Sequence, residues 1–147
     1  AREAMLLGAM LAGQAFANAP VAAVHALAYP LGGNYHIPHG LSNSLVLPHV
    51  LRFNASEAGP HYAELASIIL PNRHLPTAPL EVSELLATYF LALAEDLGLQ
   101  TTLGQMGIDQ DDLPMLAEQA MLQQRLLINN PRDVSLDDAL AIYRQAF

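Results

Sequence analysis

The segment Arg2–Asn18, REAMLLGAMLAGQAFAN, constrains the fold more than any other part of this sequence. It is rich in Ala, Leu and Met and contains no β-branched residue, a composition that favours an α-helix over a strand. Apolar residues lie nearly all around this helix, a pattern typical of a helix that is buried on most faces. We therefore expect the chain to begin with a buried core helix.

The same segment raises the question of a membrane span or a signal peptide. Its longest uninterrupted apolar run, Ala4–Gly13, is too short to cross a bilayer and ends at Gln14. Asn18, Pro20 and His25 follow soon after and interrupt the apolar character further. A buried helix is therefore the better interpretation, and we expect no membrane partner.

The rest of the chain also reads as helical. No stretch alternates convincingly between apolar and polar residues with the period of two that marks a half-buried strand. A second helix is predicted from about Pro20 to just before Pro30, and Pro30–Asn34, PLGGN, reads as a turn because of its proline and glycines. Beyond the turn, the sequence predicts a helix after Pro38, with a possible kink at Pro48, and helices at Ala58–Ile69, Val82–Leu97 and Leu113–Leu127.

The end of the chain carries the clearest helix start. Ser135 and Asp138 form the Ser-x-x-Asp pattern of a capping box, which predicts a last helix from Ser135. The proline-rich Leu70–Pro79 reads as an ordinary loop between helices. A length of 147 residues with 52% hydrophobic residues suits one domain with a substantial core. We therefore predict an all-α fold, with a single helical domain over residues 1–147.

Composition excludes several classes of function. With 14 acidic and 6 basic residues, the chain has a formal net charge of −8, which argues against nucleic acid as a partner. Every basic residue is an arginine, and the absence of lysine excludes Schiff-base chemistry and a P-loop lysine. The absence of cysteine means that any metal must be bound through His, Asp or Glu. A cytoplasmic location is compatible with this composition.

Histidines cluster on either side of the predicted turn. His25 falls in the predicted second helix and His39 at the start of the next, with thirteen residues between them. Two helices joined by a turn can bring such side chains to one point, and imidazole is a common ligand of zinc, iron and copper. Catalytic zinc sites typically use three protein ligands, however, so spacing alone leaves a metal site and two ordinary histidines both open.

The stretch around these histidines resembles a known family. VHALAYPLGGNYHIPHGLSNSLVLPHVLRFN is similar to the histidine signature of the iron-containing (group III) alcohol dehydrogenases. The resemblance extends from AREAMLLGAMLAGQAFANA to the closing NNPRDVSLDDALAIYRQAF and so covers essentially the whole chain. It implies that the chain corresponds to the C-terminal helical domain of such an enzyme.

The resemblance also implies a metal and its ligands. In that family the C-terminal domain supplies two histidine ligands to a divalent metal, usually iron and sometimes zinc, and the matching residues here are His25 and His39. The family's other two ligands, an aspartate and a histidine four residues later, belong to the portion before this sequence starts. The glycine-rich loop that binds NAD or NADP belongs to the family's N-terminal α/β domain. We therefore expect no cofactor-binding residue in this chain and a missing N-terminal domain or partner chain.

The activity implied is hydride exchange between NAD(P) and an alcohol, aldehyde or ketone, and we expect the isolated chain to be inactive. Many family members have a histidine near the substrate four residues after the first ligand, where this chain has Tyr29. With an ordinary pKa of about 10, a tyrosine is a poor proton shuttle at neutral pH. His36 is a candidate to compensate. Phe16 corresponds to a position near the substrate pocket, although a core aromatic is the plainer interpretation.

A second class of function stays open at this point. The chain could be a helical interaction module that retains the fold but does not catalyse. Its apolar first helix would then need a partner to cover it. Association of identical chains is open in either case.

Overall fold

The computed structural model describes residues 1–147 and contains helices but no strands, which confirms the predicted all-α fold. Its α-helices are α1 (Arg2–Asn18), α2 (Ala23–Tyr35), α3 (His39–Ile69), α4 (Pro79–Asp96), α5 (Leu113–Met121), α6 (Gln124–Leu127) and α7 (Leu136–Ala146). Two short 3₁₀ turns, η1 (Gly104–Met106) and η2 (Gln110–Asp112), lie between α4 and α5.

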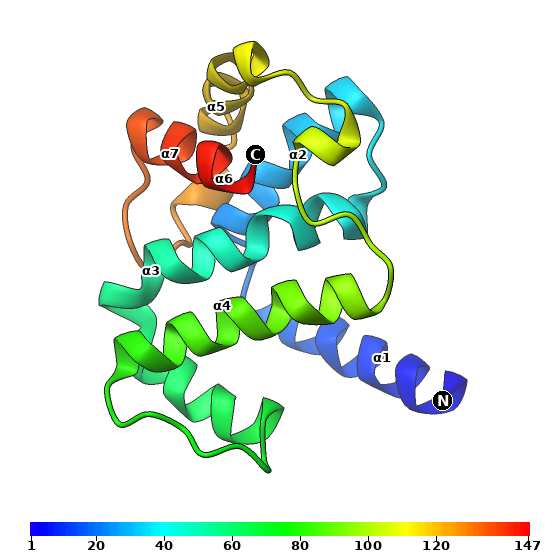
Figure 1. Ribbon diagram of the computed structural model, residues 1–147, viewed down its shortest axis with the longest axis vertical. Helices are drawn as coiled ribbons and strands as arrows, with labels where there is room; N and C mark the ends of the chain where they lie inside the picture. The colour runs from blue at the N-terminus through cyan, green and yellow to red at the C-terminus, as the bar shows by residue number, and fades with distance from the viewer.

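The helices pack around two clusters of buried side chains. The larger cluster joins α2, the first half of α3 and the C-terminal helices α5 to α7. The smaller one lies between the second half of α3 and α4, and consists of Leu51, Ala66, Leu70, Val82, Leu86 and Ala87. Figure 1 shows α3 and α4 side by side, with α2, α5, α6 and α7 gathered at the other end of the molecule. Helix α3 takes part in both clusters and so connects them.

Helix α1 forms where the sequence predicts it, but the expectation that it is buried is wrong. None of its residues is buried, and Met5, Leu6 and Phe16 expose 73%, 74% and 56% of their surface. In Figure 1 the helix runs away from the other helices to the N-terminus. The composition of α1 favours a helix, but no other element of these 147 residues covers the apolar faces of that helix.

Neither α1 nor any other single helix is long and apolar enough to span a membrane. The pair of α1 and α2 passes that test by length and composition alone, with a bend of 110° between the two helices.

The second helix is longer than predicted. Helix α2 starts at Ala23 rather than Pro20, continues through Pro30, and includes both glycines of the predicted Pro30–Asn34 turn. A proline inside a helix removes one backbone hydrogen bond and can be tolerated where packing compensates. Pro30 is itself buried, and the helix on either side of it packs into the larger cluster. Packing therefore outweighs the turn-forming tendency of these residues.

Helix α3 runs without a break through two prolines. It joins the predicted helix after Pro38 to the predicted helix at Ala58–Ile69, with Pro48 and Pro60 in its interior. The ribbon of α3 changes direction partway along its length in Figure 1. Gly59 lies where α3 contacts the start of α4. A Cβ built at this position would lie 3.0 Å from the Pro79 Cβ, which is closer than most such contacts. A glycine thus permits the close approach of these two helices.

From α4 onwards, the observed ends of the helices agree in part with the predicted ones. Helix α4 begins at Pro79, three residues before the predicted start, and the predicted Leu113–Leu127 helix is divided into α5 and α6. The loop between α3 and α4 lies where it was predicted. The capping box at the start of α7 is confirmed: the Asp138 backbone N–H donates to the Ser135 hydroxyl, and the Asp138 carboxylate accepts from the Ser135 backbone N–H.

A buried hydrogen bond connects α7 to α2. The Tyr143 hydroxyl donates to the Leu27 carbonyl oxygen at 2.6 Å, and Tyr143 is completely buried. Burial raises the pKa of Tyr143 far above its ordinary value, so the hydroxyl keeps its proton and remains a donor. This bond holds α7 against the helix that carries His25.

We expect Tyr143→Phe to lower the free energy of unfolding by about 0.5–1.5 kcal/mol, because it removes a buried hydrogen bond between α7 and α2. Urea denaturation of residues 1–147 measures this change. Tyr35→Phe is the comparison, since Tyr35 donates to Asp112 at 2.5 Å in a partly buried place. Tyr35→Phe should lower the free energy of unfolding by less than Tyr143→Phe does. A Tyr143→Phe variant as stable as the parent would contradict a stabilising role for the Tyr143 hydrogen bond.

His49 on α3 should make the fold sensitive to acid. It is 7% exposed, its Nδ1 has no hydrogen-bond partner, and its pKa is lowered to about 4, mainly by burial and secondly by Arg52, against an opposing effect of Glu84. The folded chain therefore keeps His49 neutral, while the unfolded chain protonates it below about pH 6.5. Stability should fall as the pH drops from that value towards 4.

His49→Leu should flatten this part of the pH profile, because roughly one proton fewer is taken up on unfolding. Denaturation midpoints measured across this pH range test the effect, with the exposed His74→Ala as a control. Identical profiles for the parent and His49→Leu would show that another group causes the acid sensitivity.

Candidate metal centre

The chain brings His25 and His39 together by folding back after α2. His36 ends α2 in a left-handed conformation, with φ of 55°, and Pro38 precedes the first residue of α3, which is His39. The buried Ile37 between them lies against α2, since a Cβ at Gly32 would be 3.5 Å from the Ile37 carbonyl oxygen. This return places the first turn of α3 beside the first turn of α2.

The two imidazole rings lie side by side. Their centroids are 5.1 Å apart and their planes are inclined by 53°. Two imidazoles that bind one tetrahedral ion through bonds of about 2.1 Å have ring centres about 5 Å apart. The separation in this chain therefore fits two ligands of a single divalent metal.

The surroundings favour the form of histidine that binds metal. His25 is half-buried, and its pKa is lowered first by this burial and secondly by the nearby His39. Only the neutral imidazole has a free lone pair for a metal. His25 is therefore kept in its ligand form at neutral pH, whereas His39 lies exposed at the start of its helix.

Both rings line an open hollow of about 430 Å³ between α1 and the start of α2 and α3. The Tyr29 ring contributes to the same hollow and lies 6.4 Å from the His39 ring, centroid to centroid. Phe16 of α1 lines its far side, together with Ala12, Gly13 and Val21. The structure thus gathers the predicted residues Phe16, His25, Tyr29 and His39 around one space.

His36 lies apart from this group. It is exposed at the C-terminal end of α2 and is not among the residues that line the hollow. Its predicted role as a substitute for the missing histidine at position 29 stays a prediction. The remaining three histidines also lie elsewhere: His49 is buried within α3, and His61 and His74 are exposed.

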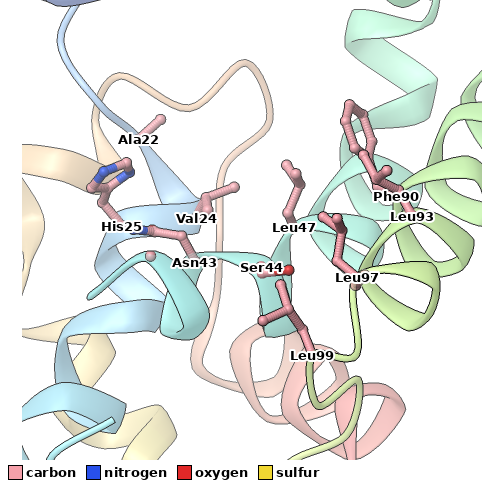
Figure 2. A pocket seen from close by; sticks show the side chains of 12 residues that line it. Ala22, Val24, His25, Asn43, Ser44, Leu47, Phe90, Leu93, Leu97 and Leu99 are labelled. Atoms are coloured by element: carbon pink, nitrogen blue, oxygen red, sulfur yellow. The ribbon is translucent and has the colours of Figure 1, made fainter. Parts of the chain in front are cut away.

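His25 also lines a second, apolar hollow of about 560 Å³. Figure 2 shows its two ends: His25, Val24 and Asn43 lie at one, and Phe90 and Leu93 of α4, with Leu97 just beyond its end, lie at the other. His25 thus forms part of the wall of both hollows.

Asn43 is a site residue that the sequence interpretation missed. It stands four residues after His39 on α3, and its Nδ2 lies 3.0 Å from His39 Nε2. A spacing of four on a helix was the available signal, because such residues are neighbours on one face. A lone asparagine in an apolar helix gave no reason to apply it.

The histidine pair is only part of a metal site. No group of three or more His, Cys, Asp or Glu side chains in the chain is placed to hold a metal ion. Additional ligands or water would be needed to complete the coordination of a catalytic ion.

Comparison with known proteins extends over the entire chain. The family model described as "Fe-containing alcohol dehydrogenase family, C-terminal" matches residues 1–147. Among curated relatives, the 1,3-propanediol dehydrogenase of Klebsiella pneumoniae is 37% identical over 147 residues, covering 100% of this chain and 38% of the relative. The long-chain-alcohol dehydrogenase 1 of Geobacillus thermodenitrificans is 39% identical, with 100% and 37% covered.

The fold is also that of a solved relative. A crystal structure of a 1,3-propanediol oxidoreductase superimposes with a TM-score of 0.84 at 36% identity, covering 93% of this chain and 35% of the other. The chain therefore spans a little over a third of the length of the proteins that it matches.

The proximity of the two rings can be tested without metal. In residues 1–147, His39→Ala should raise the pKa of His25, because the substitution removes a nearby imidazolium and some of the burial. Titration of the histidine ring protons by NMR at low ionic strength measures this pKa. The control His74→Ala, at an exposed position, should leave the pKa of His25 unchanged. If His39→Ala also leaves the pKa of His25 unchanged, the two rings do not lie close together.

Proposed function

This chain belongs to the Fe-containing alcohol dehydrogenase family, and we propose that it is the metal-binding part of a longer, NAD(P)-dependent alcohol dehydrogenase. The substrate would be an alcohol that is oxidised, or an aldehyde or ketone that is reduced. Iron is the metal we favour, with zinc as the alternative. The nucleotide would bind to a domain outside these 147 residues, and the cytoplasm is the compartment we propose.

The observation that carries this proposal is the convergence of His25 and His39 at a centroid separation of 5.1 Å. Both come from the segment that resembles the family's histidine signature, and both line a hollow large enough for a small alcohol. A divalent metal in such a site acts as a Lewis acid that polarises the substrate oxygen.

The other residues of the hollow have distinct tasks in this proposal. Phe16 offers an apolar surface to the carbon chain of the substrate, since its ring is exposed on the side of α1 that faces the hollow. Tyr29 can donate a hydrogen bond from its hydroxyl to a substrate oxygen. We assign it this positioning task and not the transfer of a proton, which leaves the proton route to another group, with His36 as the candidate.

Helix α1 supports the proposal that a further domain is present in the complete protein. Its exposed apolar side chains, Met5, Leu6, Leu7, Met10 and Leu11, form a surface of the kind that usually contacts another part of a protein. The curated relatives have more than half of their length outside the matched region. We propose that this additional part covers α1 and completes the metal site, and that residues 1–147 alone do not catalyse the reaction.

An interaction module without catalysis is the second candidate. The exposed α1 suits it equally well, because a separate partner could cover the same surface. The paired imidazoles favour the enzyme, since a module of this kind has no use for two histidines at ligand distance.

The metal content of the full-length protein tests the proposal. His25→Ala and His39→Ala should each lose bound metal and lower kcat/KM by more than about 100-fold, the upper range for loss of a residue that merely supports a ligand. Elemental analysis and steady-state kinetics give the two readouts, and circular dichroism checks the fold. The exposed His61→Ala should behave as the parent. Variants that keep a full complement of metal would refute the site, and a metal-loaded parent without turnover would favour the module.

A further inference from the structure

The proposed reaction leaves the apolar hollow of about 560 Å³ beside His25 without a task. We propose that this hollow receives the hydrocarbon chain of the substrate, so that the complete enzyme prefers medium-length and long aliphatic alcohols and aldehydes to polyols and hydroxy acids. The carbon atoms next to the hydroxyl group remain beside Phe16. This inference rests on the proposed metal site and goes beyond it, because it names the class of substrate that the site takes.

The two hollows border each other at the histidine pair. His25 lines both of them, while His39 lines the first and the next residue, Gly40, lines the second. Val21 and Ala22 are divided between the hollows in the same way. The border therefore runs past both proposed metal ligands. A substrate whose oxygen is held between the two rings has the apolar hollow next to its carbon chain.

The wall of this hollow suits hydrocarbon. Eight of its twelve lining residues are hydrophobic, and Figure 2 shows Leu47, Phe90 and Leu93 among them. His25 is the only titratable residue in the wall, so nothing there balances a charged group on a ligand. Covering such a surface with an alkyl chain removes apolar area from water on both sides. The volume also falls within the range of about 300–1,000 Å³ that is typical of sites for small molecules.

The few polar groups of the wall do not suit a polyol. Besides His25, only Asn43 and Ser44 bring polar side chains to it, and the Asn43 amide already donates to the His39 carbonyl oxygen at 3.0 Å. Further hydroxyl groups, or the carboxylate of a hydroxy acid, would lose their water here and find few partners, which costs free energy. An alkyl chain has no such groups to satisfy, and the hollow therefore favours it.

A glycine keeps the end of the hollow near the histidines open. Gly40 is the second residue of α3, and a Cβ built on it would meet no atom within 4 Å outside its own stretch of helix. A larger side chain at this position would therefore occupy free space next to His39. At the other end, Leu97 and Leu99 are 66% and 42% exposed, so a chain longer than the hollow can extend into solvent.

The dependence of the full-length enzyme on chain length tests this inference. From 1-propanol to 1-octanol, kcat/KM should rise by about 3–4-fold for each methylene group that enters the hollow, which corresponds to the free energy of burying it. Gly40→Leu should remove most of this gain, because its side chain takes the place of several methylene groups. The ratio of kcat/KM for 1-octanol to that for 1-propanol should then fall by about 10-fold or more. Steady-state kinetics measure the ratio, and the melting temperature checks the fold.

Gly33→Leu is the matched control. Gly33 is also a helical glycine with open space around it, but it does not line the apolar hollow. This variant should keep the octanol-to-propanol ratio of the parent. A ratio that falls in Phe16→Ala and not in Gly40→Leu would place the alkyl chain along α1 and overturn the inference.

The parent enzyme separates this inference from the proposed function. Turnover of 1-propanol with no rise towards 1-octanol would overturn the inference and leave the metal-dependent enzyme in place. Another segment of the complete protein that fills the hollow would give this same result. A metal-loaded parent that oxidises none of these alcohols and reduces none of their aldehydes would refute the proposed function, and the inference with it.

Discussion

The return of the chain between α2 and α3 is the constraint on which the candidate site depends. Helix α2 spans the thirteen residues Ala23–Tyr35, so a chain that simply continued would place His39 far from His25. The left-handed His36 and the contact of Ile37 with α2 at Gly32 reverse the direction within a few residues. The hydrogen bond from the Ser42 hydroxyl to the Ile37 carbonyl oxygen, at 3.2 Å, fixes the return to the first turn of α3.

Much of this fold could be predicted from local sequence. Composition indicated helices throughout, and the capping box at Ser135 gave the start of α7, because both signals act within a few residues. The path through Pro30 could not be predicted in this way, since burial against distant helices decides it. Helix α1 shows the opposite limit: its composition indicates burial, yet the surface that would cover it is not among these residues.

Some residues of the candidate site could likewise be predicted from the sequence, and others could not. The histidine signature indicated His25 and His39 through a resemblance, and the structure shows the two rings close enough for one ion. Phe16 reaches the same hollow only because α1 turns by 110° relative to α2, an angle that no local pattern encodes. Asn43 was missed because its place at the site depends on its contact with His39 and not on its own residue type.

The position of His25 between two hollows has a consequence for how the site responds to its surroundings. His25 lines both the space shared with Tyr29 and Phe16 and the apolar space that extends to α4. Any molecule or segment that fills the apolar space displaces water from the rear of the imidazole and lowers the dielectric constant around it. Filling this second hollow would therefore lower the pKa of His25 further, because burial is already the main cause of its lowered pKa.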